Sequence, residues 1–322
     1  MNRLTVIMYH YTRDLKHSRY PEIKGLDYRL FERQLQFIKE NFNVVRMEQV
    51  LNGLDNPGGV FDDAVLLTFD DGYIDNYTVV LPLLRKYGLQ GSFFIPGKTF
   101  SENVVLDVNK IHFILASASV DVIKEDLKQK LNENRYGEYG EIPSNDELYA
   151  RYAIMDRYNS RDVVFIKRLL QTVLPEKLRS KLATELFEKY VGIPENYFSR
   201  ELYMNRDQIR CMKENGMYIG IHGYDHYWLG NLSKDQMFRD IDKALNVMEE
   251  FIDRDAWVMN YPYGDYNDDV IRYISSQGCK MGLTTEVRVA NIGTDDRYKI
   301  PRLDCNDFPP KSDNYIRIGG EQ

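Results

Sequence analysis

The 322-residue sequence predicts an α/β fold built on a parallel sheet. Strand-like and helix-like segments alternate along much of the chain, and this spacing is typical of parallel strands joined by helices. Polar residues capable of chemistry directly follow three of the strand-like segments. Periodicity alone does not separate a (β/α) barrel from an open, doubly wound sheet. In a barrel, residues at the carboxyl ends of the strands form the active site.

The first half of the predicted sheet comes from four short apolar segments with helices between them. Residues 28–41 carry apolar side chains at the spacing of an amphipathic helix. A short helix is expected at residues 47–51. Residues 74–87 predict a longer helix that stops at Gly88 and is kinked at Pro82. The expected strands are residues 4–8, 43–46, 64–69 and 92–95.

The same pattern resumes after about residue 200. Ser233 and Gln236 form a capping box that opens a helix reaching to about residue 251. Glycines close two further helices, at residues 207–215 and 268–277. The expected strands are residues 218–221, 257–261 and 280–284.

Residues from about 105 to 200 interrupt the alternation. They are rich in Lys, Arg and Glu and contain few strand signals. We therefore predict one domain over residues 1–322 that carries a large all-helical insertion. A lid or substrate-shaping element, a partner surface and mere elaboration are all compatible with this composition, and we favour the first. The helical runs expected in it are residues 110–118, 122–131, 147–158, 161–173 and 176–190.

Composition excludes several classes of partner. The net charge of −7 and the absence of a basic patch argue against nucleic acid and against an anionic membrane surface. No apolar run approaches the length of a membrane span. The first eight residues are expected to form a strand and not a targeting segment. The three cysteines are widely spaced, without a C-x-x-C motif, so we expect them to be reduced and the protein to be cytoplasmic.

The run Thr68-Phe69-Asp70-Asp71-Gly72 is the most informative stretch of the chain. Two adjacent carboxylates after a buried strand are unfavourable unless a cation pairs with them. Two of the five histidines, His222 and His226, lie four residues apart. On a helix they would share a face and reach one metal ion. One Asp and two His form a three-ligand set that leaves an open coordination position, which is the catalytic arrangement.

Each of these features also has a structural explanation. An Asp pair can cap the helix that follows it, and two histidines can simply lie beside an aromatic loop. The scarcity of histidine makes coincidence the weaker explanation when both features occur together.

With a third motif, Tyr261-Pro262-Tyr263-Gly264, the chain resembles the polysaccharide deacetylase family, the NodB-homology carbohydrate esterases. The three motifs occur in the family's order, and Val6-Ile7-Met8-Tyr9-His10 also resembles the start of many members. The resemblance covers roughly residues 1–106 and 201–305. It implies a distorted (β/α) barrel with fewer than eight complete units.

The resemblance also implies a role for each motif residue. Asp70 corresponds to the general base, and Asp71, His222 and His226 to the ligands of one divalent metal ion, for which we expect zinc. The backbone N–H of Tyr263 corresponds to a donor that stabilises the developing oxyanion. The residues expected to line the substrate groove are Tyr261, Pro262, Asn260 and Arg302.

The sequence departs from the family pattern at two places. The Arg of the third motif, which steadies the catalytic Asp, is Asn260 here, and Arg302 is a candidate to supply that charge from another strand. The late Leu-x-His motif, source of the usual general acid, is missing because no histidine follows His226. Amide hydrolysis needs a proton for the leaving amine. We expect it from His10 or His112, with His17 a weaker candidate.

The sequence therefore predicts a metal-dependent hydrolase that removes an N-acetyl or N-formyl group from an amino sugar. We expect the substrate to be an intracellular glycan precursor. Two alternatives remain open: an amidase or cyclic-imide hydrolase acting on a non-sugar substrate, and a non-catalytic glycan-binding protein on the same scaffold.

Overall fold

The computed structural model describes residues 2–56, 63–157 and 159–320, and the chain divides into two compact units. The first unit comprises residues 1–14, 25–104 and 199–322 and is called the barrel unit here. The second comprises residues 15–24 and 105–198 and is called the helical unit.

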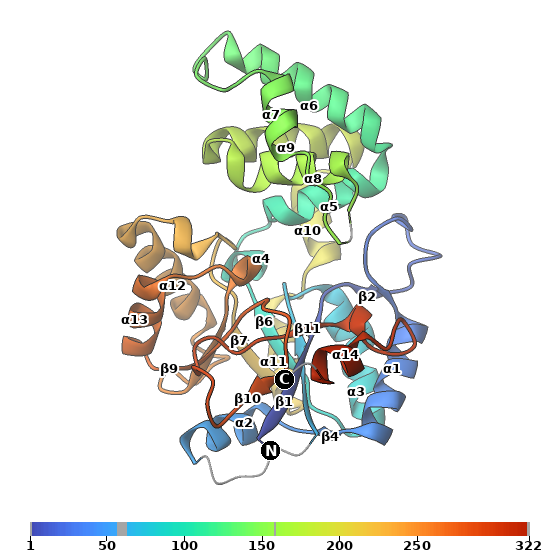
Figure 1. The fold of residues 1–322 in the computed structure, drawn as a ribbon, viewed down its shortest axis with the longest axis vertical. Helices are drawn as coiled ribbons and strands as arrows, with labels where there is room; N and C mark the ends of the chain where they lie inside the picture. Colours follow the sequence, from blue (N-terminus) through green and yellow to red (C-terminus); the bar gives the residue numbers. More distant parts are fainter. Residues whose placement is uncertain (1, 57–62, 158, 321–322) are drawn as a thin grey trace. The chain divides into compact units, whose positions relative to one another are not determined.

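A curled, mostly parallel sheet forms the centre of the barrel unit (Figure 1). Neighbouring strands on its main path pair in parallel, except that residues 3–4 and 290–291 pair antiparallel. The short strand β4 (Asn43–Val44) also pairs with β5. The strand order is β10 (Ala290–Asn291), β1 (Arg3–Tyr9), β5 (Ala64–Phe69), β6 (Ser92–Ile95), β7 (Tyr218–Ile221), β8 (Trp257–Asn260) and β9 (Cys279–Leu283).

An irregular segment connects β9, the last strand of this order, to β1. Ile300 forms a parallel bridge with Leu283 at the end of β9. Three residues later, β11 (Leu303–Asp304) pairs in parallel with Ile7 and Met8 of β1. Residues 300–304 thus connect β9 to β1. The predicted distorted (β/α) barrel is confirmed.

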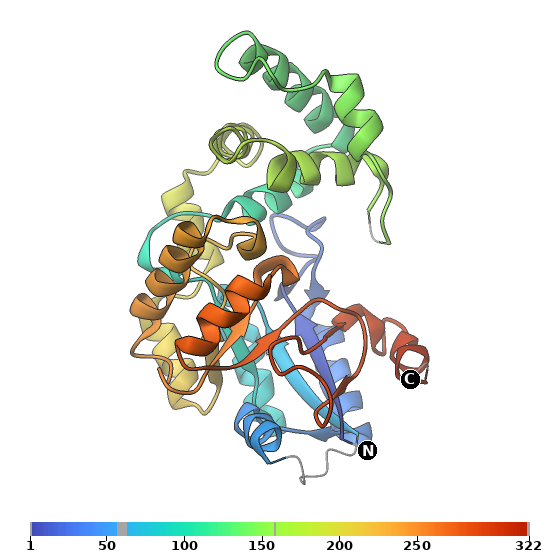
Figure 2. The same cartoon turned by 60° about the vertical axis from the view of Figure 1, so that its left-hand side comes forward.

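Helices cover the outer face of the sheet (Figures 1 and 2). Figure 1 shows α1 and α3 on one flank and α12 and α13 on the other. The two-residue strands β2 (Thr12–Arg13) and β3 (Leu26–Asp27) pair with each other. The helices of this unit are α1 (Tyr28–Asn41), α2 (Met47–Asp55), α3 (Leu81–Tyr87), α4 (Gly97–Ser101), α11 (Arg206–Glu214), α12 (Lys234–Met248), α13 (Asp268–Ser276) and α14 (Asn314–Gly320).

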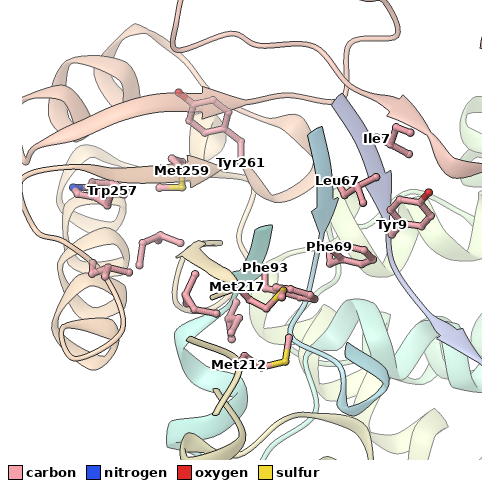
Figure 3. Packing of buried hydrophobic residues seen from close by; sticks show 14 of the residues in the cluster. Ile7, Tyr9, Leu67, Phe69, Phe93, Met212, Met217, Trp257, Met259 and Tyr261 are labelled. Carbon is pink, nitrogen blue, oxygen red and sulfur yellow. The ribbon is translucent and has the colours of Figure 1, made fainter. Parts of the chain in front are cut away.

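Two apolar layers follow from the alternation of side chains along each strand. One set of strand residues packs against the outer helices, and Figure 3 shows part of this layer. The alternate residues fill the inside of the curl together with apolar residues of α2. The outer layer includes Ile7, Tyr9, Leu67, Phe69, Phe93, Trp257, Met259 and Tyr261; the inner layer includes Leu4, Val6, Leu66, Phe94, Val258, Met281 and Leu283.

The helical unit has its own core, and its described residues contain no strand. Four rings meet edge to face in this core: Phe113 packs against Tyr20 and Phe198, and Phe187 packs against Phe198. Its helices are α5 (Asp107–Ser117), α6 (Val120–Arg135), α7 (Asn145–Tyr152), α8 (Arg161–Arg168) and α9 (Glu176–Tyr190); α10 (Glu195–Leu202) runs from this unit into the barrel unit.

The expected element boundaries differ from the observed ones at several points. The helix expected at residues 147–158 ends at Tyr152, and residue 158 lies outside the described residues. A π-helical stretch, Asn76–Val80, comes just before Pro82. The short helix α4 and the helix α10 were not predicted. All three cysteines are free, as expected. No helix in the described ranges has the length and apolarity to cross a bilayer.

Candidate active site

The candidate site lies where the central strands end, and its residues continue the inward row of side chains. Strand β1 pairs with β5 in register, so that Met8 is opposite Thr68 and Tyr9 is opposite Phe69. Because side chains alternate, the next inward positions on these two strands are His10 and Asp70. On the adjacent strands β7 and β8, Gly220 and Val258 are inward positions. Two residues further along, His222 and Asn260 are therefore the next inward positions.

Asp70 is a buried carboxylate with its two oxygens in different surroundings. Oδ1 accepts a hydrogen bond from Nη1 of Arg302 at 2.8 Å. Oδ2 lies 3.8 Å from Nε2 of His10, whose side chain is 39% exposed. Burial raises the pKa of the Asp70 carboxyl, but the Arg302 guanidinium, helped by the nearby imidazoles of His10 and His222, outweighs it and holds this pKa below its usual value. Asp70 is therefore ionised at neutral pH and can accept a proton at Oδ2.

Arg302 reaches Asp70 from the segment that closes the barrel. The side chain is only 1% exposed, although it is a full charge. Its Nε donates to the carbonyl oxygen of Thr284 at 2.8 Å, and Nη1 also lies 3.3 Å from the hydroxyl of Thr68. These contacts satisfy a guanidinium that would otherwise be very unfavourable in the interior. The positive charge beside Asp70 thus comes from Arg302 and not from the position of Asn260.

Asp71, His222 and His226 bring three possible ligand atoms together. These atoms all lie within 4.8 Å of one another, and all three residues are buried. Oδ1 of Asp71 is 3.5 Å from Nε2 of His222 and 3.4 Å from Nε2 of His226. Ligands about 2.0–2.1 Å from a tetrahedral zinc ion are separated by about 3.3–3.4 Å. The two distances from Asp71 match this spacing, and all three residues offer ligand atoms within 4.8 Å of one another.

The surroundings of these atoms fit a cation better than they fit a hydrogen-bond network. Nδ1 of His222 lies 2.6 Å from the carbonyl oxygen of Asn260, which makes Nδ1 the donor and leaves a lone pair on Nε2. Burial lowers the pKa of His226, although Asp71 opposes the shift, so this imidazole is neutral. Oδ1 of Asp71 is buried without a hydrogen-bond partner among the described residues. Its second oxygen, Oδ2, accepts a hydrogen bond from the hydroxyl of Tyr73.

Burial also raises the pKa of Asp71, but the imidazoles of His222 and His226 outweigh it and bring this pKa well below its usual value. Asp71 is therefore a carboxylate at neutral pH. A divalent cation within reach of the Asp71 oxygen and both imidazoles would take the place of these imidazole contacts.

Unusual backbone conformations occur at the same place. Among the described residues, four non-glycine residues have a positive φ, and three of them are Asp71 (71°), His226 (58°) and Tyr263 (59°). Such conformations are unfavourable for L-residues and persist where the surrounding structure enforces them, often at functional sites. His222 and His226 consequently lie on a loop and not on a helix, and the loop, not a helical repeat, brings the two rings together.

The third motif splits between the site and the core. Tyr263 lies in the site: its ring contacts that of His226 edge to face at 4.7 Å and stacks on that of Trp228 at 4.3 Å. The turn that carries Tyr263 is closed by Gly264, whose N–H donates to the carbonyl of Tyr261 at 2.8 Å, and includes the buried Pro262. The Tyr261 side chain belongs to the outer layer (Figure 3), and its hydroxyl donates to the carbonyl of Tyr298. The Tyr261 ring is thus in the core and not in a groove wall.

The two histidines expected as the proton donor belong to different units. His10 lies in the site beside Asp70, whereas His112 lies on α5 of the helical unit. His17 also belongs to the helical unit. Asn260 contributes its backbone carbonyl, while the two polar atoms of its fully buried side chain have no hydrogen-bond partner among the described residues.

Sequence reasoning missed two polar contacts of this site. Tyr73 lies two residues after Asp71. The sequence indicated only that a helix begins near it, so the hydrogen bond of its hydroxyl to Asp71 was not predicted. Asp240 lies in the middle of α12, where it looked like an ordinary polar residue of an amphipathic helix, yet it is buried against the His222–His226 loop.

Comparison with known proteins agrees with this geometry. The family described as "Polysaccharide deacetylase" matches residues 59–133 and 184–282, which is more than half of the chain. The protein named "Putative polysaccharide deacetylase YxkH" of Bacillus subtilis (strain 168) is 19% identical over 290 residues, covering 90% of this chain and 67% of its own length.

Solved structures show the same fold. The deacetylase PplD of Streptococcus pyogenes, solved with acetate, has a TM-score of 0.57 at 17% identity, with 98% of this chain and 96% of PplD covered. IcaB from Ammonifex degensii has a TM-score of 0.58, with the same identity and coverage. At such identities these likenesses bear on the fold alone, whereas the family match extends over most of the motif-bearing sequence. The chain is a member of the polysaccharide deacetylase family.

Proposed function

We propose that the protein is a metal-dependent hydrolase that removes an N-acyl group, acetyl or formyl, from an amino-sugar unit of a glycan or glycan precursor. The observation that carries the proposal is the cluster of Asp71, His222 and His226 beside the ionised Asp70. This arrangement combines three ligand atoms with a separate proton acceptor, in a chain of a family named for deacetylation.

Asp71, His222 and His226 would hold the ion, for which zinc suits the ligand types. When bound, a divalent cation supplies Lewis-acid polarisation and lowers the pKa of a water molecule. Asp70 accepts the proton of the attacking water at Oδ2, the oxygen that Arg302 leaves available. The N–H of Tyr263 is assigned to the oxyanion, since its turn presents Tyr263 beside His226.

Proton delivery to the leaving amine is assigned to His10. Its Nε2 lies beside Oδ2 of Asp70, and its ring is partly exposed, so it is accessible to a substrate. An N–H of the imidazolium protonates the amine nitrogen as the C–N bond breaks. The proton that Asp70 took from water can then return to His10 across 3.8 Å, which restores both groups.

The direct test is acetate release from N-acetylglucosamine oligomers by the zinc-loaded protein, with Asp70→Asn as the matched variant. We expect turnover in the wild type and a loss of at least about a hundredfold in Asp70→Asn, because the amide cannot accept the proton. Both proteins should contain equal zinc. Hydrolysis of simple amides or cyclic imides, but not of the oligomers, would instead favour the amidase alternative. Bound zinc without any turnover would favour a glycan-binding protein.

The metal site makes its own prediction. His222→Ala should bind about one zinc ion fewer per chain, measured by elemental analysis after dialysis against a weak chelator. His17→Ala is the matched control, because His17 lies in the other unit and should leave the zinc content unchanged. Wild-type zinc content in His222→Ala would rule out the ligand assignment.

Replacement of Arg302 should destabilise the barrel unit. Arg302→Met leaves the Asp70 carboxylate buried without its cation, and we expect a loss of about 3–5 kcal/mol in the free energy of unfolding. Both tryptophans, Trp228 and Trp257, lie in the barrel unit, so their fluorescence in a denaturant titration follows this unit.

The double variant Asp70→Asn/Arg302→Met should recover part of that stability, because it removes both charges of the pair. Equal stability of Arg302→Met and the wild type would mean that the pair contributes nothing to the fold.

His10→Ala should lower kcat by about 10²–10⁴-fold, the usual range for a general acid, with zinc content unchanged. The comparison is with His112→Ala, which we expect to remain near the wild-type rate. If His112→Ala is the impaired variant, the proton donor is on the helical unit. If both variants keep full activity, proton delivery must come from Asp70 itself.

A further inference from the structure

We propose that Asp240 is a positioning residue that fixes the loop between His222 and His226, so that His226 meets the other two ligand residues. The inference rests on the proposed metal site and deepens it. Asp240 is neither a ligand nor a group that touches the substrate, and it acts through the backbone of residues 223–226.

The carboxylate of Asp240 makes two hydrogen bonds to consecutive backbone groups of the loop. Oδ2 accepts from the N–H of Tyr224 at 2.9 Å, and Oδ1 accepts from the N–H of Asp225 at 2.8 Å. Asp240 is only 5% exposed, on α12. A buried carboxylate that receives two N–H groups holds both in a fixed geometry, and charge-assisted bonds of this kind are among the stronger ones.

The loop is also held from its other side. The N–H groups of Gly97 and Lys98, at the start of α4, donate to the carbonyls of Gly223 and Tyr224 at 3.0 and 3.1 Å. Helix α4 therefore donates hydrogen bonds to carbonyl groups of the loop, while Asp240 accepts hydrogen bonds from its N–H groups. A buried polar backbone group without a partner is strongly unfavourable, so the loop depends on both supports for this conformation.

His226 needs this support more than His222 does. His222 follows β7 directly, and its Nδ1 is fixed by the carbonyl of Asn260 at 2.6 Å. His226 has a left-handed backbone with φ of 58°, and its Nδ1 is buried without a hydrogen-bond partner among the described residues. No hydrogen bond of its own ring thus sets the direction of Nε2. The backbone of the loop and the ring packing of Tyr263 must do so.

Close packing makes the Asp240 contact specific. Gly223 has φ of 67°, and a Cβ added there would lie 3.0 Å from Oδ2 of Asp240. Only glycine combines that φ with room for the carboxylate. Lys98 pairs with Asp225 at 2.5 Å on the partly exposed side of the same loop, so Asp225 supplies a neighbouring charge that pairs with a side chain.

The test compares the zinc affinity of Asp240→Asn with that of Asp225→Asn, by competition with a chromophoric chelator. The amide introduced by Asp240→Asn would offer one acceptor oxygen where the carboxylate offers two, so one loop N–H loses its partner. We expect Asp240→Asn to bind zinc about 10–100-fold more weakly, as is usual for loss of an outer support. Asp225→Asn removes the same charge nearby and should stay within about threefold of the wild type.

A double-mutant cycle of zinc affinity with His226→Ala separates a role through His226 from a general loss of stability. If Asp240 acts through His226, Asp240→Asn should weaken zinc binding much less in the His226→Ala background than in the wild type. Equal losses in the two backgrounds, or wild-type affinity in Asp240→Asn, would overturn the inference. If Asp240→Asn does not fold, Gly223→Ala serves as the second variant, and wild-type zinc affinity in it would overturn the inference as well.

A different set of results would reject the proposed metal site itself. In that case the wild type itself binds no zinc, or His222→Ala binds as well as the wild type. A wild type that binds zinc, a His222→Ala variant that does not, and an Asp240→Asn variant with unchanged affinity would reject the role of Asp240 alone.

Discussion

The ion pair of Arg302 with Asp70 is the interaction on which the site and the closure of the barrel both depend. Arg302 lies in the segment that joins β9 to β1, and its guanidinium contacts β5 through Thr68 and Asp70. The pair therefore links the last part of the chain to the first strands across the barrel interior. A buried pair of this kind is unfavourable to break, since either charge alone would remain desolvated. The same contact keeps Asp70 ionised and leaves one of its oxygens available.

Around this pair, the site is built from strand ends and strained turns. The strands fix the inward row, because register and alternation leave little freedom in where His10, Asp70 and His222 lie. The turns after the strands then bring in Asp71, His226 and Tyr263 through left-handed conformations. The strain is small at each residue, about 1–3 kcal/mol, and the rigid sheet beneath supplies the packing that maintains it. Rigid strands carry the proposed proton acceptor, and constrained loops carry two of the residues around the proposed ion.

Much of the fold could be predicted from the sequence, because the relevant signals are local. Short apolar segments indicated β1 and β5, the capping box indicated the start of α12, and Gly88 indicated the end of α3. The site was harder, since it depends on pairs distant in sequence. Arg302, 232 residues after Asp70, was named as its partner only because the resemblance left that charge to be supplied, and the structure places the two in contact. The conformation of the His222–His226 loop is set by Asp240 and α4, so spacing alone could not exclude a helix. Tyr261 was misplaced because parity in β8 sends its ring to the outer layer while its motif partner Tyr263 turns into the site.

The parity of the strands has a consequence for how such a protein can change during evolution. Substitutions within the inward row exchange one chemical group for another at a fixed place, as the positions of Asn260 and Arg302 illustrate. Loss or gain of one residue inside β5 would exchange the two faces of the strand beyond that point. Phe69 would then lie on the inner face with the polar residues, and Asp70 in the outer apolar layer. Replacing a side chain at this end of the sheet changes one group, whereas changing the length of the strand displaces every group beyond that point. Most of the helical unit lies in the connection between β6 and β7, outside the paired strands.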